Sequence, residues 1–523
     1  MTDTAAAPPG AQRTSLYAWV VLTMLALIYI FNFLDRQLMS VLIESIKNDP
    51  AFLTQQPDGQ MKGLTDEQMG WMTGFWFALV YTVLGVIVGF LADRTSRRNI
   101  LFVGATLWSG FTALCGLSHN YLTLLLSRVG VGVGEAAGAP PSYSIISDYF
   151  PAEKRGLALA LFSMGVPLGQ AAAIAFGAQV DKAYGWRMAF IVIGVAGVIA
   201  ALLMLFVVRE PKRGAMDPAK MAAIAHEKSS FGATFWHFIS RPALLWTAMG
   251  CGVSAFVGYA ALGWNASFLM RTLHMSRDEL SLWYALVIGV GIGIGTLGSG
   301  FIVDIMAKRS RVWYALTPLI AMAAAIPFWY LYTQAQDWPM ALGLLILPLL
   351  FNIFYLAPGI ALVNNSVKPS QRTMSSAILL MVLNFIGLGG GPTLVGILST
   401  SFANQKVAVG MEAALAGAEG LRDALLWMTP FLGVAVFFIA LQALAIKREE
   451  KAGGPVSDGG FAVGVLLLLV GVAGLGARYY FGGTAGMTST DFMPLLQMSM
   501  LVIATALGLV LLAGAGRRKK AAT

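Results

Sequence analysis

The chain has 523 residues, of which 57% are hydrophobic and 12% are charged. Soluble domains carry about a quarter charged residues, so the composition excludes a soluble protein and indicates an integral membrane protein. The net charge of +9 does not indicate a nucleic-acid binder, because the basic residues form short clusters between apolar segments, as cytoplasmic loops do. Four histidines and two cysteines without a CxxC motif predict no metal, no cofactor and buried free thiols at Cys115 and Cys251.

Residues 1–16 are polar and rich in Pro and Ala, and the apolar run that follows is too long for a signal peptide, so we expect a cytoplasmic tail. Apolar runs of about 18 residues or more predict membrane-spanning helices. Fourteen such runs lie near residues 17–42, 69–91, 99–117, 121–147, 156–180, 187–208, 243–268, 280–303, 312–332, 339–364, 373–400, 424–446, 461–481 and 492–514. A polar stretch at 209–242 predicts a linker between two six-helix halves, 17–208 and 243–446.

The last two apolar runs have no counterpart in either half. We expect an accessory transmembrane hairpin at 461–514, joined to the core by a linker at 447–460 and followed by a basic tail at 515–523. Of the 35 Lys and Arg residues, 24 fall in one alternate set of loops and tails and 9 in the other. This asymmetry predicts cytoplasmic termini and a multi-pass protein of the cell's inner (plasma) membrane.

The two predicted halves repeat each other. GFLADRTSRR at 89–98 is matched by GFIVDIMAKRSR at 300–311, and each segment closes the second helix of its half. Parallel repeats about an axis along the membrane normal predict a binding site near midplane, between the halves. We therefore expect an all-α polytopic membrane protein whose six-helix halves are related by pseudo-two-fold symmetry.

Two ionisable residues, Arg128 and Glu135, lie inside the fourth predicted helix. Such groups are costly in a membrane unless they meet water or a partner, so they usually mark function. Seven residues apart, they share a helix face at a separation of roughly 10 Å, so each needs a partner elsewhere. Gly130, Gly134 and Gly138 form a small-residue ridge that we expect to pack on a neighbouring helix. The alternative is a buried ion pair that only fixes helix register.

Asp35 and Arg36 lie in the outer part of the first predicted helix, at a depth close to that of Arg128. Consecutive residues point about 100° apart on a helix, so only one of the two can face a central cavity squarely. We favour Asp35, paired with Arg128. The alternative places both residues at a wetted helix end, solvated and without function.

The segment GFLADRTSRR resembles the loop signature of the major facilitator superfamily, and the repeat, the central linker and the twelve-helix core fit the same family. More narrowly, FNFLDRQ, SRVGVGVGEA, DYFPAEKRG and the GWR at 185–187 resemble the Spinster branch over roughly residues 15–446. This resemblance implies transport of a lipid-like cargo, such as a lysophospholipid or a sphingoid phosphate, with coupling to protons. The hairpin and the long first external loop depart from the family pattern, and the sequence assigns that loop no role.

Within this resemblance, Glu135 is the expected proton-coupling carboxylate. It lies about fourteen residues into a helix entered from outside, roughly 20 Å deep. Burial favours its neutral form, whereas an approaching cation such as Arg36 or Arg128 favours the charged form. Asp35 is the second candidate, because its shallower position and its neighbour Arg36 both favour the charged form.

The resemblance also implies a conformational latch. The acid that matches Asp93 in the superfamily sits against a helix N-terminus, where the helix dipole favours negative charge, and the arginine that matches Arg97 meets an acid, here Asp148. We expect these contacts to form only when the halves close on the cytoplasmic side, in the outward-open state. The second copy has Asp304 but no acid in the place of Asp148, so we expect it to be weaker. The alternative is that these charges only enforce topology.

Amides in spanning segments are the remaining candidates. We expect Asn352 and Asn384, together with Arg36 and Arg128, to contact the cargo, and the alternative is that such amides join helices. GIGTLG at 293–298 matches a nucleotide-binding pattern but has no strand before it, so we expect helix packing. For Arg187 we expect an interfacial anchor.

These features predict a secondary transporter that works as a monomer by rocking of the two halves. The sequence contains no HExxH, GxSxG or P-loop motif, so we do not expect an enzyme. A receptor without flux would not need paired intramembrane charges. The cargo is either an amphipathic lipid or a small organic anion or drug. A cavity with a polar N-terminal wall and an apolar C-terminal wall, open sideways to lipid, would favour the lipid.

Overall fold

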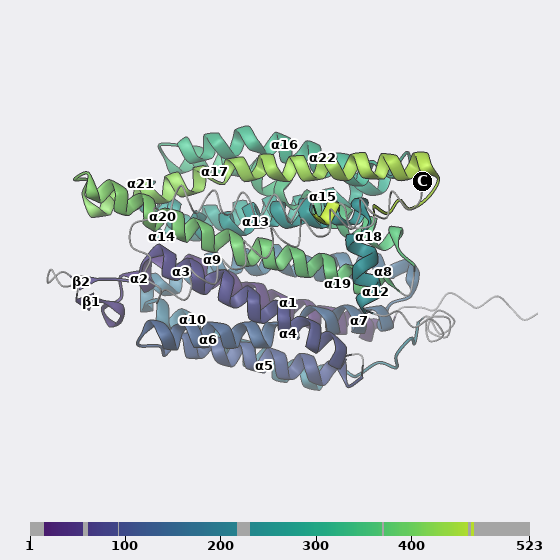
Figure 1. Ribbon diagram of the computed structural model, residues 1–523. Coiled ribbons are helices and arrows are strands. Elements are labelled where there is room, and N and C mark those ends of the chain that lie inside the picture. The colour runs from purple at the N-terminus through teal and green to yellow at the C-terminus, as the bar shows by residue number, and fades with distance from the viewer. Residues whose placement is uncertain are drawn as a thin grey trace, which may run out of the picture.

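The computed structural model describes residues 15–55, 61–92, 94–216, 231–368, 371–458 and 462–464. Within these ranges, twelve helical segments are long and apolar enough to cross a membrane. They match the first twelve predicted spans, and the predicted fold class is confirmed. The helices run alongside one another as two bundles, one from each half of the chain (Figure 1). Asp93 and nearly all of the predicted hairpin at 461–514 lie outside the described residues.

We call the side that carries the Lys- and Arg-rich loops the inner side and the opposite side the outer side. The N-terminal half contains six spans, several of which consist of two consecutive helices. In chain order they are α1 (Leu16–Val41), α3 (Asp66–Thr73) with α4 (Phe75–Ala92), α5 (Arg97–Gly116), α6 (Tyr121–Glu135) with α7 (Ala139–Tyr149), α8 (Ala152–Ser163) with α9 (Gly165–Tyr184), and α10 (Trp186–Val207).

The C-terminal half repeats this arrangement and also contains short 3-10 and π-helical turns within its spans. Its elements are α13 (Pro242–Arg271), α14 (Arg277–Glu279) with the π-helical η2 (Leu280–Tyr284) and α15 (Ala285–Met306), α16 (Trp313–Gln334), α17 (Trp338–Asn352) with the 3-10 turn η3 (Ile353–Tyr355) and α18 (Leu356–Ser366), α19 (Arg372–Leu383) with the π-helical η5 (Asn384–Gly390) and α20 (Gly391–Ala408), and α21 (Ala413–Leu426) with α22 (Thr429–Ala452).

Glycine and proline explain where several spans break. η5 contains three glycines at 387–390, and α7 begins at Ala139, directly after Gly138, with Pro140 and Pro141 in its first turn. Proline removes a backbone donor and glycine permits irregular geometry. Inside a membrane such backbone is tolerated where neighbouring helices and local 3-10 or π turns satisfy the freed groups.

The predicted glycine ridge of α6 packs on α5. A Cβ atom on Gly134 would lie 2.4 Å from the backbone nitrogen of Trp108, and one on Gly130 would lie 2.5 Å from the Phe111 ring. Only glycine permits this approach of the two helices. The opposite face of α6, which carries Arg128 and Glu135, is thereby turned toward α1 and α4.

The described parts of the long outer loop between the first two spans, 42–55 and 61–65, pack against the N-terminal half. They contain α2 (Ile43–Lys47), a 3-10 turn η1 (Pro50–Phe52), and an antiparallel strand pair, β1 (Thr54–Gln55) and β2 (Met61–Lys62), at one end of the molecule (Figure 1). Phe52 is buried against Trp186, whose indole donates to Asp49 at 2.8 Å. Arg187 forms an ion pair with Asp49, so it binds this loop, and its role as an interfacial anchor stays a prediction.

The linker that follows α10 stays with the N-terminal half. Glu210 accepts from Arg97 Nε at 2.8 Å, and Arg213 donates to the carbonyl oxygens of Ala92 and Thr95. The backbone N–H of Gly214 donates to Asp148 at 3.0 Å. At its other end, α12 (Phe231–Ile239) packs on α13 and α19 of the C-terminal half. The predicted linker at 209–242 is therefore divided between the two halves.

Candidate functional site

A cavity of about 840 Å³ lies between the two halves. Its N-terminal wall is largely polar. Tyr29, Phe33 and Arg36 contribute from one face of α1, Gln170 from α9, and Tyr143 from α7. Tyr29, Phe33 and Arg36 share this face because they lie four and three residues apart on a helix.

The C-terminal wall is mostly apolar and includes Val257, Leu262, Ile292, Trp329, Leu349, Leu356, Ile360 and Leu380. Three amides, Asn352, Asn364 and Asn384, interrupt it, and Asn352 and Asn384 are the two that were predicted to contact the cargo. Asn384 begins η5 and lines the cavity, while Asn352 lines it and donates from Nδ2 to the Ser254 carbonyl at 3.1 Å. The cavity therefore has the asymmetry between its walls that an amphipathic cargo needs.

Arg36, rather than Asp35, faces the cavity, so the prediction that Asp35 would face it is wrong. Arg36 donates to Glu135 Oε2 from Nε at 3.0 Å and from Nη2 at 2.5 Å, and the Glu135 side chain is fully buried. The guanidinium carbon also lies over the rings of Phe33 and Tyr81, 5.0 and 4.9 Å from their centroids. Asp35 points about 100° away on the helix and is only 1% exposed.

The predicted ion pair between Asp35 and Arg128 is also absent. Arg128 donates instead to the backbone carbonyl oxygens of Asp35, at 3.3 Å, and Arg36, at 3.2 Å, and lies over the Phe77 ring. Within the described residues, Asp35 Oδ1 has no hydrogen-bond partner. Arg128 is not in the wall of the main cavity and lines only a smaller one beside it. Arg128 thus fixes the backbone that carries Arg36, and direct contact of Arg128 with cargo in the main cavity is not supported.

Arg97 and Asp148 form the predicted ion pair, at 2.5 Å, but the pair does not connect the halves. α5 and α7 both belong to the N-terminal half, so this contact needs no approach of the C-terminal half. The prediction that it forms only when the inner side closes is wrong. Asp304 is exposed and, among the described residues, forms no ion pair.

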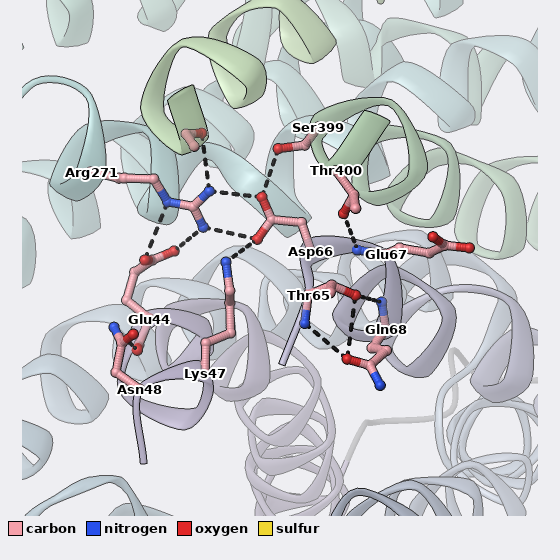
Figure 2. A network of polar contacts seen from close by, with 11 residues as sticks. Glu44, Lys47, Asn48, Thr65, Asp66, Glu67, Gln68, Arg271, Ser399 and Thr400 are labelled. Carbon is pink, nitrogen blue, oxygen red and sulfur yellow. Dashed lines mark hydrogen bonds and ion pairs between the residues drawn. The ribbon is translucent and has the colours of Figure 1, made fainter. Parts of the chain in front are cut away.

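On the outer side, a buried charge network joins the halves (Figure 2). Arg271 of α13 reaches two acids of the N-terminal half at once, Glu44 at 2.6 Å and Asp66 at 2.7 Å. Asp66 is 6% exposed, pairs also with Lys47, and accepts from Ser399 at 2.6 Å. A bidentate arginine between two carboxylates is a strong and geometrically specific contact.

Two further ion pairs cross between the halves, Arg277 with Asp181 at 2.7 Å and Lys182 with Asp278 at 2.5 Å. In the part of the chain that the structure describes, every ion pair between the halves lies on the outer side. The cavity wall, in contrast, extends to Ser147 and Arg372 at inner helix ends. The outer side is closed and the cavity opens inward.

The sequence reasoning missed this outer network. Lys47 and Arg271 belong to the smaller set of nine loop charges, which in the sequence indicates only topology. A local signal was present for Asp66, because Thr65 and Gln68 form a capping box that places this acid in the first turn of α3. No local signal indicates its partner Arg271, which lies 205 residues away.

Two six-helix halves around a central cavity, closed on one side by ion pairs between the halves, define a multi-pass membrane transporter. The chain belongs to the Major Facilitator Superfamily, whose sequence pattern matches residues 25–392. It is 31% identical over 398 residues to an MFS-type efflux pump of Mycolicibacterium smegmatis, covering 76% of this chain and 88% of that one. It is 26% identical to protein spinster homolog 1 of Xenopus tropicalis, covering 84% of this chain and 83% of that one.

The fold agrees with a solved structure, a bacterial homologue of the human lysosomal transporter Spinster in an inward-facing, unoccupied conformation. The TM-score is 0.72 at 28% identity, covering 84% of this chain and 99% of that one. These similarities place the chain in the Spinster branch, as its motifs predict. Its relatives are transporters rather than enzymes.

Proposed function

We propose that the protein is a proton-coupled transporter that moves a single-chain, lipid-like cargo, such as a lysophospholipid or a sphingoid phosphate, by alternating access. The observation that carries this proposal is the ion pair of Arg36 and Glu135 in the wall of a cavity with one polar and one apolar side. An intramembrane ion pair in a cavity wall marks a site for ions or charged cargo, and the apolar side suits a hydrocarbon chain.

Coupling follows from competition for Arg36. An ionised Glu135 holds the guanidinium through two hydrogen bonds. A proton on Glu135 removes the negative charge, and Arg36 then becomes available to an anionic group of the cargo. Proton binding and cargo binding therefore favour each other, and release of one favours release of the other. Asp35 is the weaker candidate for the proton site, because it faces away from the cavity.

Conversion to an outward-open state requires the Arg271 network to separate. We propose that Asp93 and, more weakly, Asp304 then help to close the inner side. We further propose a monomer in the cell's inner membrane with cytoplasmic termini, as the distribution of Lys and Arg indicates.

A second candidate cargo is a small organic anion or drug. It is favoured by the similarity to an efflux pump, and Arg36 suits any anion. The two candidates differ in the need for a long hydrocarbon chain along the apolar wall.

Transport into proteoliposomes, with and without a pH gradient, tests both parts of the proposal. The probes are a lysophospholipid with a labelled acyl chain and a short-chain organic anion dye. We expect gradient-driven uptake of the lipid by the wild type, and Glu135→Gln should abolish gradient-driven uptake while retaining binding. Glu153→Gln, which changes an exposed acid at the start of α8, is the matched control and should transport normally.

Gradient-driven uptake that survives in Glu135→Gln but is lost in Asp35→Asn would reverse the roles of the two acids. Uptake of the dye without uptake of the lipid would establish the second candidate instead.

A further inference from the structure

Among the described residues of the cavity wall, Gln170 has a buried amide oxygen without a hydrogen-bond partner. Gln170 of α9 lines both the main cavity and the smaller cavity beside it, is 4% exposed, and has no hydrogen bond to its Oε1 within the described residues. Other amides nearby are engaged. Asn352 donates to Ser254, and Gln37 donates to the Leu262 carbonyl at 2.9 Å. Buried polar groups nearly always have a partner, so Gln170 is the amide that a bound molecule is best placed to satisfy.

Close packing of α9 on α1 fixes the position of Gln170. A Cβ atom on Gly169 would lie 2.5 Å from the Ile30 carbonyl oxygen and 2.9 Å from Phe33 Cβ, and one on Gly165 would lie 3.1 Å from the Tyr29 ring. The two glycines allow α9 to lie directly against the helix that carries Arg36. The amide is held there by the backbone, so its place in the wall does not depend on a flexible loop.

Gln170 and Arg36 bound the same small space. The smaller cavity has a volume of about 30 Å³, room for about one or two water molecules, and both residues line it. Its other walls include Tyr259, Leu262 and Pro392 of the C-terminal half. A polar group that enters the end of the main cavity at Arg36 therefore comes within reach of the Gln170 amide too.

We propose that Gln170 determines specificity by binding a free hydroxyl or amino group next to the anion held by Arg36. This inference rests on the proposed lipid cargo. In a lysophospholipid, the carbon next to the phosphate-bearing carbon carries a free hydroxyl; in a sphingoid phosphate, the equivalent carbon carries an amine. Both groups donate a hydrogen bond to an amide oxygen. A diacyl phospholipid carries an ester there, which cannot donate, so Gln170 selects the single-chain form.

The test compares two probes that differ in one hydrogen-bond donor. Lysophosphatidylcholine has only its sn-2 hydroxyl as a donor, and its 2-O-methyl ether has none. Equilibrium binding of each probe is measured on the full-length protein in detergent. We expect the wild type to bind the hydroxyl probe roughly three- to tenfold more tightly than the ether, as one net hydrogen bond provides. Gln170→Leu should bring this ratio to about one.

Gln405→Leu is the matched control, since it removes an exposed amide of α20 that lies outside both cavities and should leave the ratio as in the wild type. Thermal unfolding verifies that each variant folds. Gln170→Met, whose unbranched side chain has a similar length, replaces Gln170→Leu if the latter folds poorly.

A ratio unchanged in a folded Gln170 variant would overturn the inference. Equal binding of both probes by the wild type would also overturn it, while leaving the lipid cargo intact. Failure of the wild type to bind either probe, together with binding of the organic anion dye, would refute the lipid cargo and this inference with it.

Discussion

Removing Arg271 should shift the protein toward the outward-open state. In Arg271→Gln the two carboxylates of Glu44 and Asp66 lose the cation that ties them to α13. Removing one partner from a buried ion pair costs about 3–5 kcal/mol. The loss of free energy in Arg271→Gln is smaller, because Asp66 retains its ion pair with Lys47 and its hydrogen bond from Ser399. The side chains of Arg271 and Glu44 are also 13% and 20% exposed to solvent. We expect about 1–3 kcal/mol, a 5- to 150-fold change in the ratio of the two states.

Distances between spin labels across the outer side measure this shift. Tyr184 and Val409 are 75% and 84% exposed and lie on different halves, so cysteines placed there will accept labels. Cys115 and Cys251 are buried and can be replaced. The distance should lengthen in Arg271→Gln. Lys182→Gln is the matched control, because the Lys182–Asp278 pair is more than half exposed and such pairs contribute about 0–1 kcal/mol. Equal distances in Arg271→Gln and the wild type would refute this reasoning.

Three other predictions concern the outer loop, helix packing and the C-terminal segment. Partial burial opposes ionisation of Asp49, but hydrogen bonds from Arg187, the Ala51 N–H and Trp186 outweigh it and hold the pKa of Asp49 below its ordinary value. The ionised Asp49 therefore stabilises the fold at any pH above its ordinary pKa, and this stabilisation is lost only as the pH falls through the lowered pKa. The loss of thermal stability in Asp49→Asn should be equal at pH 6 and pH 8, and a loss at only one of them would contradict this. Gly134→Ala places a Cβ against the Trp108 backbone and should lower the free energy of unfolding by about 1–3 kcal/mol, whereas Gly110→Ala, with open space around it, should not; equal unfolding midpoints would argue against tight packing of α5 and α6. A spanning hairpin at 461–514 predicts that a cysteine replacing Ala485 reacts with external reagents and one replacing Gly516 does not, while equal protection of both would exclude it.

The spans were predictable because the bilayer sets both their length and their apolar composition. The amides Asn352 and Asn384 were predictable for a related reason, since a polar side chain in such a span avoids lipid and turns inward. Both line the cavity.

The choice between Asp35 and Arg36 was not predictable from charge alone. A helical period gives the angle between two side chains but not the rotation of the helix in its bundle. The aromatic residues Tyr29 and Phe33 share the face of Arg36, and their rings line the cavity with it. That pattern was the available signal. The outer network was inaccessible for another reason, since its partners come from different halves and lie up to 227 residues apart in the sequence.

The attachment of the linker to the N-terminal half changes where the two moving bodies end. Glu210 is bound to α5, Arg213 to the end of α4 and the turn before α5, and Gly214 to Asp148, so under the proposed alternating access we expect all three to move with the first six spans. We expect α12, which packs on α13 and α19, to move with the other six. A fluorescent protein inserted between residues 209 and 214 would therefore disturb contacts within the N-terminal half and would not report motion between the halves. Paired reporters on Glu210 and α12 would instead follow the relative motion of the halves at their inner ends.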